Sequence, residues 1–268
     1  MAVDASLMAS AVVDSGKLFN APSLCMNFDP TLWGEAAGCT TDWNAIPPSI
    51  APGGSPDPNP DSVRESNRVT TLVKAIERVK GAMPQHTLTC AMAGPATLAK
   101  FLEFDQAPSR MDQFTVGELI TEYINILCEN KIGNVIIMEE AGIDDAALAP
   151  WINGDHYSKI AKLADHYSTE TTLLCPQASL SDEQVREFDS LTYVIGQADK
   201  TMEASFTHAT KGFAVDGFGS GSVVLPAGLE DLTQGSYFLT TQWDLDPASD
   251  FTSIQQDIAT VRMFLNAH

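Results

Sequence analysis

The sequence predicts an α/β protein folded as a (β/α)8 barrel, the TIM-barrel architecture. Strand-like and helical segments alternate along the 268 residues, and the strands are continuous apolar runs without a period of two. Such strands are typical of a parallel sheet whose faces are covered by helices. Seven or eight strands are expected, which fits a barrel of this length. Their centres are Leu24, Leu88, Val135, Leu173, Tyr193, Phe213, Val223 and Tyr237.

A doubly wound open sheet is the alternative architecture. Its dinucleotide-binding version lacks support, because no G-x-G-x-x-G motif follows the first strand. The whole chain, residues 1–268, is therefore expected to form a single barrel domain.

The charge balance limits the classes of partner. The chain has 35 acidic and 15 basic residues, for a formal net charge of -20. This charge repels nucleic acids and anionic membranes, so neither is expected as a partner. No apolar run approaches the ~18 residues that a membrane-spanning helix needs. The first residues lack the basic region of a signal peptide, which predicts a cytoplasmic protein.

The five cysteines predict reduced thiols. They are Cys25, Cys39, Cys90, Cys128 and Cys175; their number is odd, and no two form a C-x-x-C pair. Most lie in apolar segments, where a cysteine usually serves packing.

The first element is a helical pattern over residues 2–20, followed by a short apolar strand over 23–28 that ends on Asp29. An acid at the carboxyl end of a buried strand is where α/β folds place their chemistry. The alternative is that Asp29 caps the helix that begins near Pro30.

The next segment, residues 44–62, contains six prolines and two glycines, which predicts a long polar loop. A loop of this length in a compact domain is usually functional, so we expect it to act as a lid.

The middle of the chain continues the alternation. Helices are expected over 62–80, 97–104 and 116–130, and strands over 87–92 and 134–138. The second of these strands ends on Glu139 and Glu140, which Asp144 and Asp145 follow. Clustered carboxylates raise one another's pKa, and such an acid can serve as a general acid. Alternatively, only Glu139 points inward and the other three carboxylates lie in solvent.

The remaining elements are expected as follows. Helices are predicted over 155–168, 181–188, 202–210 and 253–265, and strands over 171–175, 191–195, 212–215, 223–225 and 237–241.

Four short motifs occur together in one order and spacing. They are Phe28-Asp29 with Ala36-Ala37-Gly38, Ala93-Gly94-Pro95-Ala96-Thr97-Leu98, Glu140-Ala141-Gly142, and Gln242-Trp243-Asp244-Leu245-Asp246-Pro247. Over residues 20–265 the chain resembles the superfamily of uroporphyrinogen decarboxylase and the cobalamin- and zinc-dependent methyltransferases that share its barrel. The resemblance implies the uroporphyrinogen-decarboxylase-like form of the TIM barrel.

The resemblance assigns residues one at a time. Asp29 matches the acid that lies at the barrel mouth of the decarboxylases, whereas their Arg-rich N-terminal motif is absent. Phe101 stands where they have a tyrosine, and Gln242 falls near their C-terminal histidine. Cys175 matches one zinc ligand of the methyltransferases, but the matching histidine is missing. Cys175 is therefore a partial candidate for a zinc site or, alternatively, a plain buried thiol.

These assignments predict an enzyme pocket under the 44–62 loop. Asp29, Glu139 and Gln242 are the candidate catalytic residues, and Cys175 is the candidate metal ligand. Residues expected to bind the substrate are Gly94, Pro95, Phe101, Glu140 and Trp243, with the first two letting the backbone approach the ligand.

Methyl transfer or demethylation of a small organic substrate is the expected reaction. Zinc, with a corrinoid or folate as methyl carrier, is the implied cofactor set, and a corrinoid protein or a second copy of the chain is the expected partner. The alternatives are a decarboxylase-type lyase without metal and a non-catalytic ligand-binding barrel.

Overall fold

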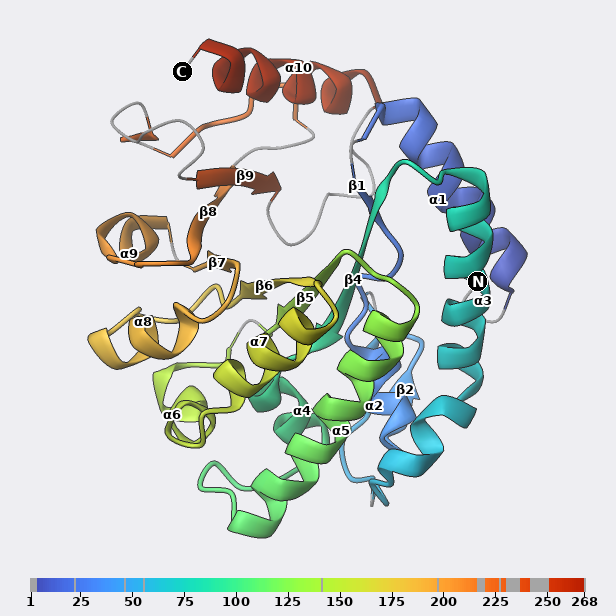
Figure 1. Ribbon diagram of the computed structural model, residues 1–268, viewed down its shortest axis with the longest axis vertical. Helices are drawn as coiled ribbons and strands as arrows, with labels where there is room; N and C mark the ends of the chain where they lie inside the picture. Colours follow the sequence, from blue (N-terminus) through green and yellow to red (C-terminus); the bar gives the residue numbers. More distant parts are fainter. Residues whose placement is uncertain are drawn as a thin grey trace.

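A computed structural model of the protein has one large parallel sheet with helices along its outer side (Figure 1). It describes residues 4–21, 23–45, 47–54, 56–140, 142–196, 198–215, 220–226, 228–229, 237–241 and 251–267. The sheet strands are β1 (Ser23–Cys25), β4 (Thr87–Ala93), β5 (Asn134–Met138), β6 (Glu170–Leu174), β7 (Tyr193–Ile195), β8 (Thr210–Val215) and β9 (Tyr237–Thr241). Each strand pairs in parallel with the next one along the chain, and the sheet curls like part of a barrel.

The strand order confirms the parallel α/β prediction at the level of the barrel-like sheet. A doubly wound sheet reverses its order at a switch point, whereas these strands follow the chain from β1 to β9 without reversal. Within the described ranges the sheet has seven strands, and no pairing joins β9 to β1.

The predicted strand over 223–225 is wrong, since only Val224 forms an isolated bridge there. The backbone N–H groups of Gly221 and Val223 instead donate to the buried Asp257 carboxylate, at 3.0 and 3.1 Å. A side chain has thus taken donors that a strand would use for its ladder.

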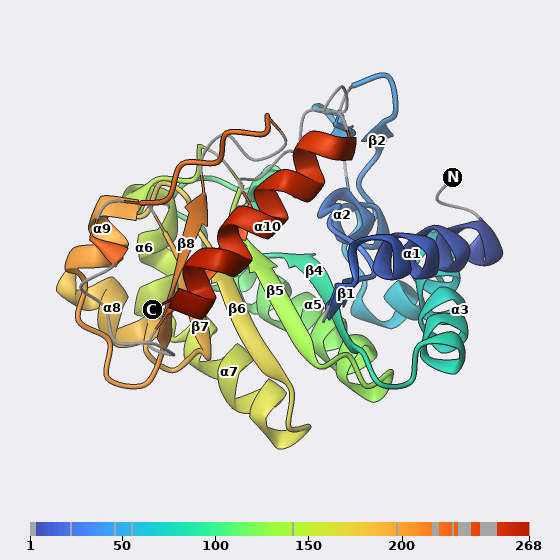
Figure 2. The same cartoon turned by 90° about the horizontal axis from the view of Figure 1, so that it is seen from above.

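The helices lie along the outer side of the sheet (Figure 2). They are α1 (Ala5–Phe19), α2 (Thr31–Ala36), α3 (Asn67–Ala82), α4 (Pro95–Phe101), α5 (Arg110–Glu129), α6 (Asp145–Asn153), α7 (His156–His166), α8 (Asp182–Phe188), α9 (Ala198–Glu203) and α10 (Phe251–Ala267). The helix expected over 62–80 is present as α3, and an apolar face of it is buried, as shown by Val69, Leu72, Ile76 and Val79. No helix of the described ranges is both long and apolar enough to cross a membrane.

The segment over 44–62 has some regular structure. It contains β3 (Ser49–Ile50), which pairs with β2 (Thr41–Asp42), and the start of the 3-10 helix η1 (Pro60–Glu65). The backbone N–H of Gly53 donates to the Glu103 carboxylate just after α4, so this part of the segment lies against the end of that helix. Its predicted action as a lid stays a prediction.

Candidate functional site

Asp29 follows directly on the ladder between β1 and β4. Although β1 is short, the pairing continues through Met26 N to Thr89 O and Ala91 N to Asn27 O, each at 2.8 Å. The chain then turns into α2, and the Asp29 Oδ1 atom accepts hydrogen bonds from Thr31 N at 2.9 Å and Thr31 Oγ1 at 2.6 Å. The helix-capping role that the sequence offered as an alternative is therefore present.

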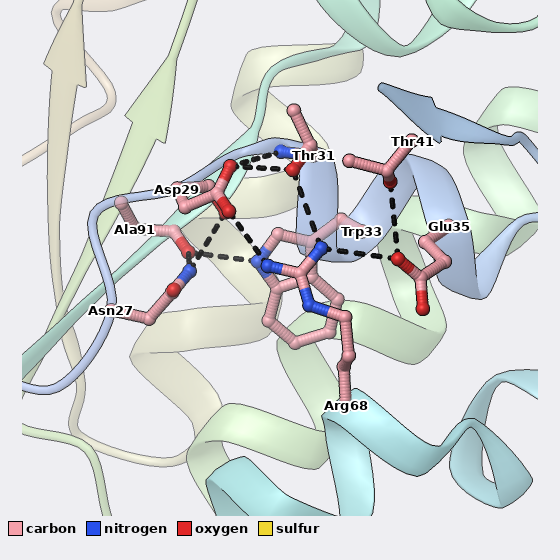
Figure 3. A network of polar contacts seen from close by, with 8 residues as sticks. All are labelled: Asn27, Asp29, Thr31, Trp33, Glu35, Thr41, Arg68 and Ala91. Carbon is pink, nitrogen blue, oxygen red and sulfur yellow. Dashed lines mark hydrogen bonds and ion pairs between the residues drawn. The ribbon is translucent and has the colours of Figure 1, made fainter. Parts of the chain in front are cut away.

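The second oxygen of Asp29 faces Arg68 of α3. Arg68 Nη2 lies 2.6 Å from Asp29 Oδ2, and Nη1 lies 3.3 Å from both Glu35 Oε2 and Thr31 Oγ1. Figure 3 shows the guanidinium between the two carboxylates. The Arg68 side chain is 5% exposed, whereas those of Asp29 and Glu35 are 29% and 33% exposed. One buried cation thus holds two acids that keep part of their surface in solvent.

Aromatic and backbone groups fix this network. The Trp43 ring lies 4.7 Å from the Arg68 guanidinium carbon, a cation–π contact. Trp33 Nε1 donates to Ala91 O at 2.8 Å, and Asn27 Nδ2 donates to Asp29 O at 2.9 Å (Figure 3). The strand end and α2 are therefore tied to β4, and Asp29 has a defined backbone position.

Glu139, at the end of β5, lies in a different environment. It is 1% exposed, and its carboxylate accepts hydrogen bonds from Tyr157 OH at 2.6 Å, from Thr97 N and Oγ1 at 2.8 Å, and from Ala96 N at 3.3 Å. Burial raises the pKa of Glu139 above its ordinary value, and the hydrogen bonds from Tyr157 and Thr97 oppose that rise. The expectation that Glu139 points inward is confirmed, and it caps α4 from the neighbouring strand.

Gly94 and Pro95 serve this capping contact. A Cβ atom at Gly94 would lie 2.2 Å from Glu139 Oε1, so only glycine lets the carboxylate approach the helix. Pro95 is the first residue of α4, where its missing N–H costs nothing. The close approach at Gly94 is thus made by Glu139, and ligand binding by Gly94 and Pro95 stays a prediction.

Phe101 and Glu140 line a cavity of about 230 Å³ between α4 and the 44–62 segment, which contributes Ile50. Glu140 Oε2 lies 3.0 Å from Lys100 Nζ, and Phe101 is buried at 5% exposure. A Cβ atom at Gly34 of α2 would lie 2.9 Å from both Ile50 and Phe101 side-chain atoms. Two residues that line the cavity therefore also pack against the helix that Asp29 caps, in the region where the sequence predicts a substrate pocket.

Cys175 follows β6 and is 2% exposed, with Sγ 3.6 Å from Ile195 O. Burial raises its pKa, and the negative charges of Glu139 and Asp145 add to the rise. A zinc site needs three or four protein ligands, of which Cys175 would be one. The described residues also contain no group of three or more His, Cys, Asp or Glu side chains placed around one ion. The donors near Cys175 in this part of the chain do not fit zinc.

The predicted residues form separate groups in the described structure. Glu139 and Cys175 both lie near Tyr157. Burial is the largest cause of the raised pKa of Tyr157, and the charges of Glu139 and Cys175 raise this pKa further. No hydrogen bond or ion pair joins Asp29 to Glu139 within the described ranges. Gln242 and Trp243 lie outside the described residues.

Comparison with known proteins identifies a similar fold. No protein-family model matches the sequence, and a search of curated proteins gives no match. Among solved structures, a methyltransferase from Methanosarcina mazei superposes with a TM-score of 0.71 and 14% sequence identity. The match covers 98% of this chain and 86% of that protein. The barrel-like fold of the chain is therefore the fold of that methyltransferase.

Sequence reasoning missed four residues that build these groups: Arg68, Trp43, Thr97 and Tyr157. One signal was present for Arg68, which lies four residues before Leu72 on the apolar face of α3. A cation on an apolar stripe is rarely buried without a charged partner, so the position itself points to an acid. Nothing local marks Tyr157, because its partner Glu139 lies on another element.

Proposed function

We propose that this protein is an enzyme that transfers a methyl group to or from a small organic molecule at the carboxyl edge of the sheet. The observation that carries the proposal is the structural similarity to a methyltransferase over 98% of the chain. The position of Asp29 at the end of the first strand supports the location, because barrel enzymes place their chemistry at this edge.

The reaction needs a nucleophilic acceptor atom. As the bond from the donor to the methyl carbon breaks, the acceptor–methyl bond forms, and a protonated acceptor such as a thiol must lose its proton. The partly exposed Asp29 carboxylate is suited to take that proton or to stabilise positive charge nearby. Arg68 is a positioning residue that holds the Asp29 carboxylate in its orientation.

A corrinoid or a folate would supply the methyl group as a co-substrate. Zinc is not part of the proposal for the described residues, because the donors around Cys175 do not fit it. The cavity beside Ile50, Phe101 and Glu140 is the proposed place for part of the substrate.

The test combines binding and turnover. Methylcobalamin or methyltetrahydrofolate serves as the methyl donor and simple thiols as acceptors, and the visible absorbance of the corrinoid or chromatography follows the transfer. We expect wild-type protein to catalyse transfer with at least one pair, and Asp29→Asn to lose it. Glu129→Gln, which removes only an exposed ion pair with Arg64, is the matched control.

A non-catalytic ligand-binding barrel is the second candidate. It is favoured by one observation: the carboxylates of both Asp29 and Glu139 are already engaged by groups of the chain itself. Stabilisation by a donor or acceptor molecule without turnover, seen as a rise in melting temperature, would support this candidate.

A further inference from the structure

A larger cavity lies away from the Asp29 network, between α5 and α7 on the outer side of the sheet. These two helices lie next to one another in Figure 1. The cavity has a volume of about 490 Å³, which is within the range of small-molecule sites. It shares no lining residue with the Asp29 network or with the cavity at Phe101.

His156 is the polar side chain that makes this cavity unusual. It lines the cavity and is only 8% exposed, with Trp151 packed edge-on against it at a centroid distance of 5.2 Å. Its ring makes no hydrogen bond to any residue of the described ranges. The ring nitrogens are not among the buried side-chain atoms that lack a partner, so they are accessible from the cavity, and a neutral imidazole offers one donor and one acceptor there. The geometry therefore leaves His156 available to a bound molecule.

The ring is neutral at physiological pH. Burial lowers the pKa of His156 to about 4; the positive charge of Lys159 adds to this shift, and Asp155 opposes it. Arg110 and Glu118, on the facing helix, complete the charged groups that line the cavity.

Two glycines make the space around the ring. A Cβ atom at Gly154 would lie 2.7 Å from His156 Cδ2, so this position must stay glycine for the ring to fit. Gly117 lies inside α5, where glycine weakens a helix relative to alanine. A Cβ atom there would lie 3.5 Å from Cε1 and 3.9 Å from Nδ1 of the ring. The glycine thus leaves free the space beside one nitrogen of His156.

The charges around the cavity favour an anion. Arg110 and Lys159 line it against the single acid Glu118, in a protein whose net charge is -20. Arg110 has no ion pair within the described ranges, and Lys159 Nζ is bound only to a backbone oxygen, that of Gly154, at 2.7 Å. A locally positive, partly apolar cavity concentrates small anions on an otherwise repelling surface.

Apart from Gln113 and Thr121, the other side chains that line the cavity are apolar. Phe114 is 62% exposed, and Ile120 and Ile160 are buried at 3% each. We propose that the cavity between α5 and α7 is a second binding site, for a small organic anion with a flat apolar body. The anionic group lies between Arg110 and Lys159 and contacts the His156 ring, and the apolar body lies against Phe114 and the isoleucines.

Phenylacetate is the probe for the test, with its neutral amide as the ligand control and phenyl phosphate to separate carboxylate from phosphate preference. Calorimetry measures affinity, and NMR of the histidine ring reports contact at His156. We expect phenylacetate or phenyl phosphate to bind and to shift the His156 signals. The amide should bind about tenfold more weakly, and Arg110→Gln should remove most of that difference.

Gly117→Ala separates binding from folding. The added methyl group fills the space beside Nδ1, so affinity should fall by about tenfold, while the melting temperature should rise by roughly 2 °C. Gly81→Ala on α3 is the matched control, since its Cβ atom would meet no neighbouring side chain or other element within 4 Å in the described structure. This control should give a similar rise in melting temperature and unchanged affinity.

Three results would overturn the proposal. They are no binding of either anion at millimolar concentration, equal affinity for acid and amide, and unchanged affinity in Gly117→Ala. The proposal would also be contradicted by a dimer in solution whose interface covers Phe114 and whose association neither phenylacetate nor phenyl phosphate changes.

Discussion

Asp29 and Glu139 look alike in the sequence and differ in the structure. Each is the acid that follows an apolar strand, β1 or β5, at the same edge of the sheet. The Asp29 side chain is 29% exposed and paired with a buried arginine. Glu139 is 1% exposed, and the groups of the described residues that bind it are all uncharged donors. The comparison teaches that position in the fold locates a carboxylate, whereas its partners decide whether it can meet a ligand.

The origin of the difference lies in which helix each acid caps. Asp29 binds Thr31 at the start of its own following helix and keeps one oxygen for Arg68. Glu139 reaches back to α4, the helix of the preceding strand, where Gly94 leaves room for its whole carboxylate. Asp29 is therefore the ligand-facing acid in our proposal, and Glu139 holds the fold.

The largest effect is expected for Glu139→Ala. This change leaves the donors of Thr97 and Tyr157 buried without an acceptor and should lower the free energy of unfolding by about 3 kcal/mol. Denaturant unfolding measures it. Glu140→Ala, which removes only an ion pair with the 55% exposed Lys100, is the control and should cost about 0.5 kcal/mol or less. Equal losses in the two variants would contradict the structural role of Glu139.

The next effect concerns Asp29 and Arg68. Asp29→Asn should cost about 2 kcal/mol, because it leaves the buried guanidinium with Glu35 as its remaining ionic partner. A double-mutant cycle with Arg68→Met should give a coupling energy of about 1 kcal/mol. The same cycle at Lys100 and Glu140 should give less than about 0.5 kcal/mol. Additive losses at Asp29 and Arg68 would show that the pair does not act as a unit.

A smaller effect is expected for Gly94→Ala. Its Cβ atom would clash with the Glu139 carboxylate, and the displacement should cost about 1.5 kcal/mol. In the Glu139→Ala background the clash is absent, so the same substitution should cost much less. An equal cost in both backgrounds, measured by unfolding, would mean that Gly94 is needed for another reason.

The smallest effect is a change in how the free energy of unfolding depends on pH. Because burial raises the folded-state pKa of Glu139, its contribution to stability is fully present below the unfolded-state value and is lost as the pH rises through the folded-state value. Relative to wild type, Glu139→Gln should therefore gain stability as the pH rises above about 4.5. Unfolding midpoints of both proteins, measured between about pH 4 and pH 8, test the direction of this change in relative stability. The prediction is contradicted if the stability of Glu139→Gln relative to wild type falls as the pH rises.

The sequence predicted the order of the strands and helices better than the contacts between them. Apolar strands and the stripe on α3 depend on neighbouring residues, so the parallel order and the buried Val69 and Leu72 could be predicted. The segment over 223–225 has the composition of a strand, but the N–H of Val223 donates to Asp257 of a distant helix. The sequence pattern of a short segment does not show that a side chain far along the chain will accept its backbone hydrogen bonds.

The same limit applies to the site. Asp29 could be located because it follows a strand, and its helix cap depends on Thr31 two residues away. Its pairing with Arg68 spans 39 residues and depends on how α3 lies beside α2. Similarly, no local feature indicates that Tyr157 and Thr97 meet at Glu139. The position of the candidate acid Asp29 follows from local sequence, whereas its partners follow from packing between elements.

The most direct test of the central claim is the rate of methyl transfer by Asp29→Asn, beside Glu129→Gln, with a donor and acceptor pair that wild type uses. Both variants are assayed at a temperature where circular dichroism shows them folded. We expect Asp29→Asn to be slower by about 100-fold and Glu129→Gln to stay within about twofold of wild type. A rate for Asp29→Asn within about twofold of wild type would contradict the assignment of Asp29 as the ligand-facing acid.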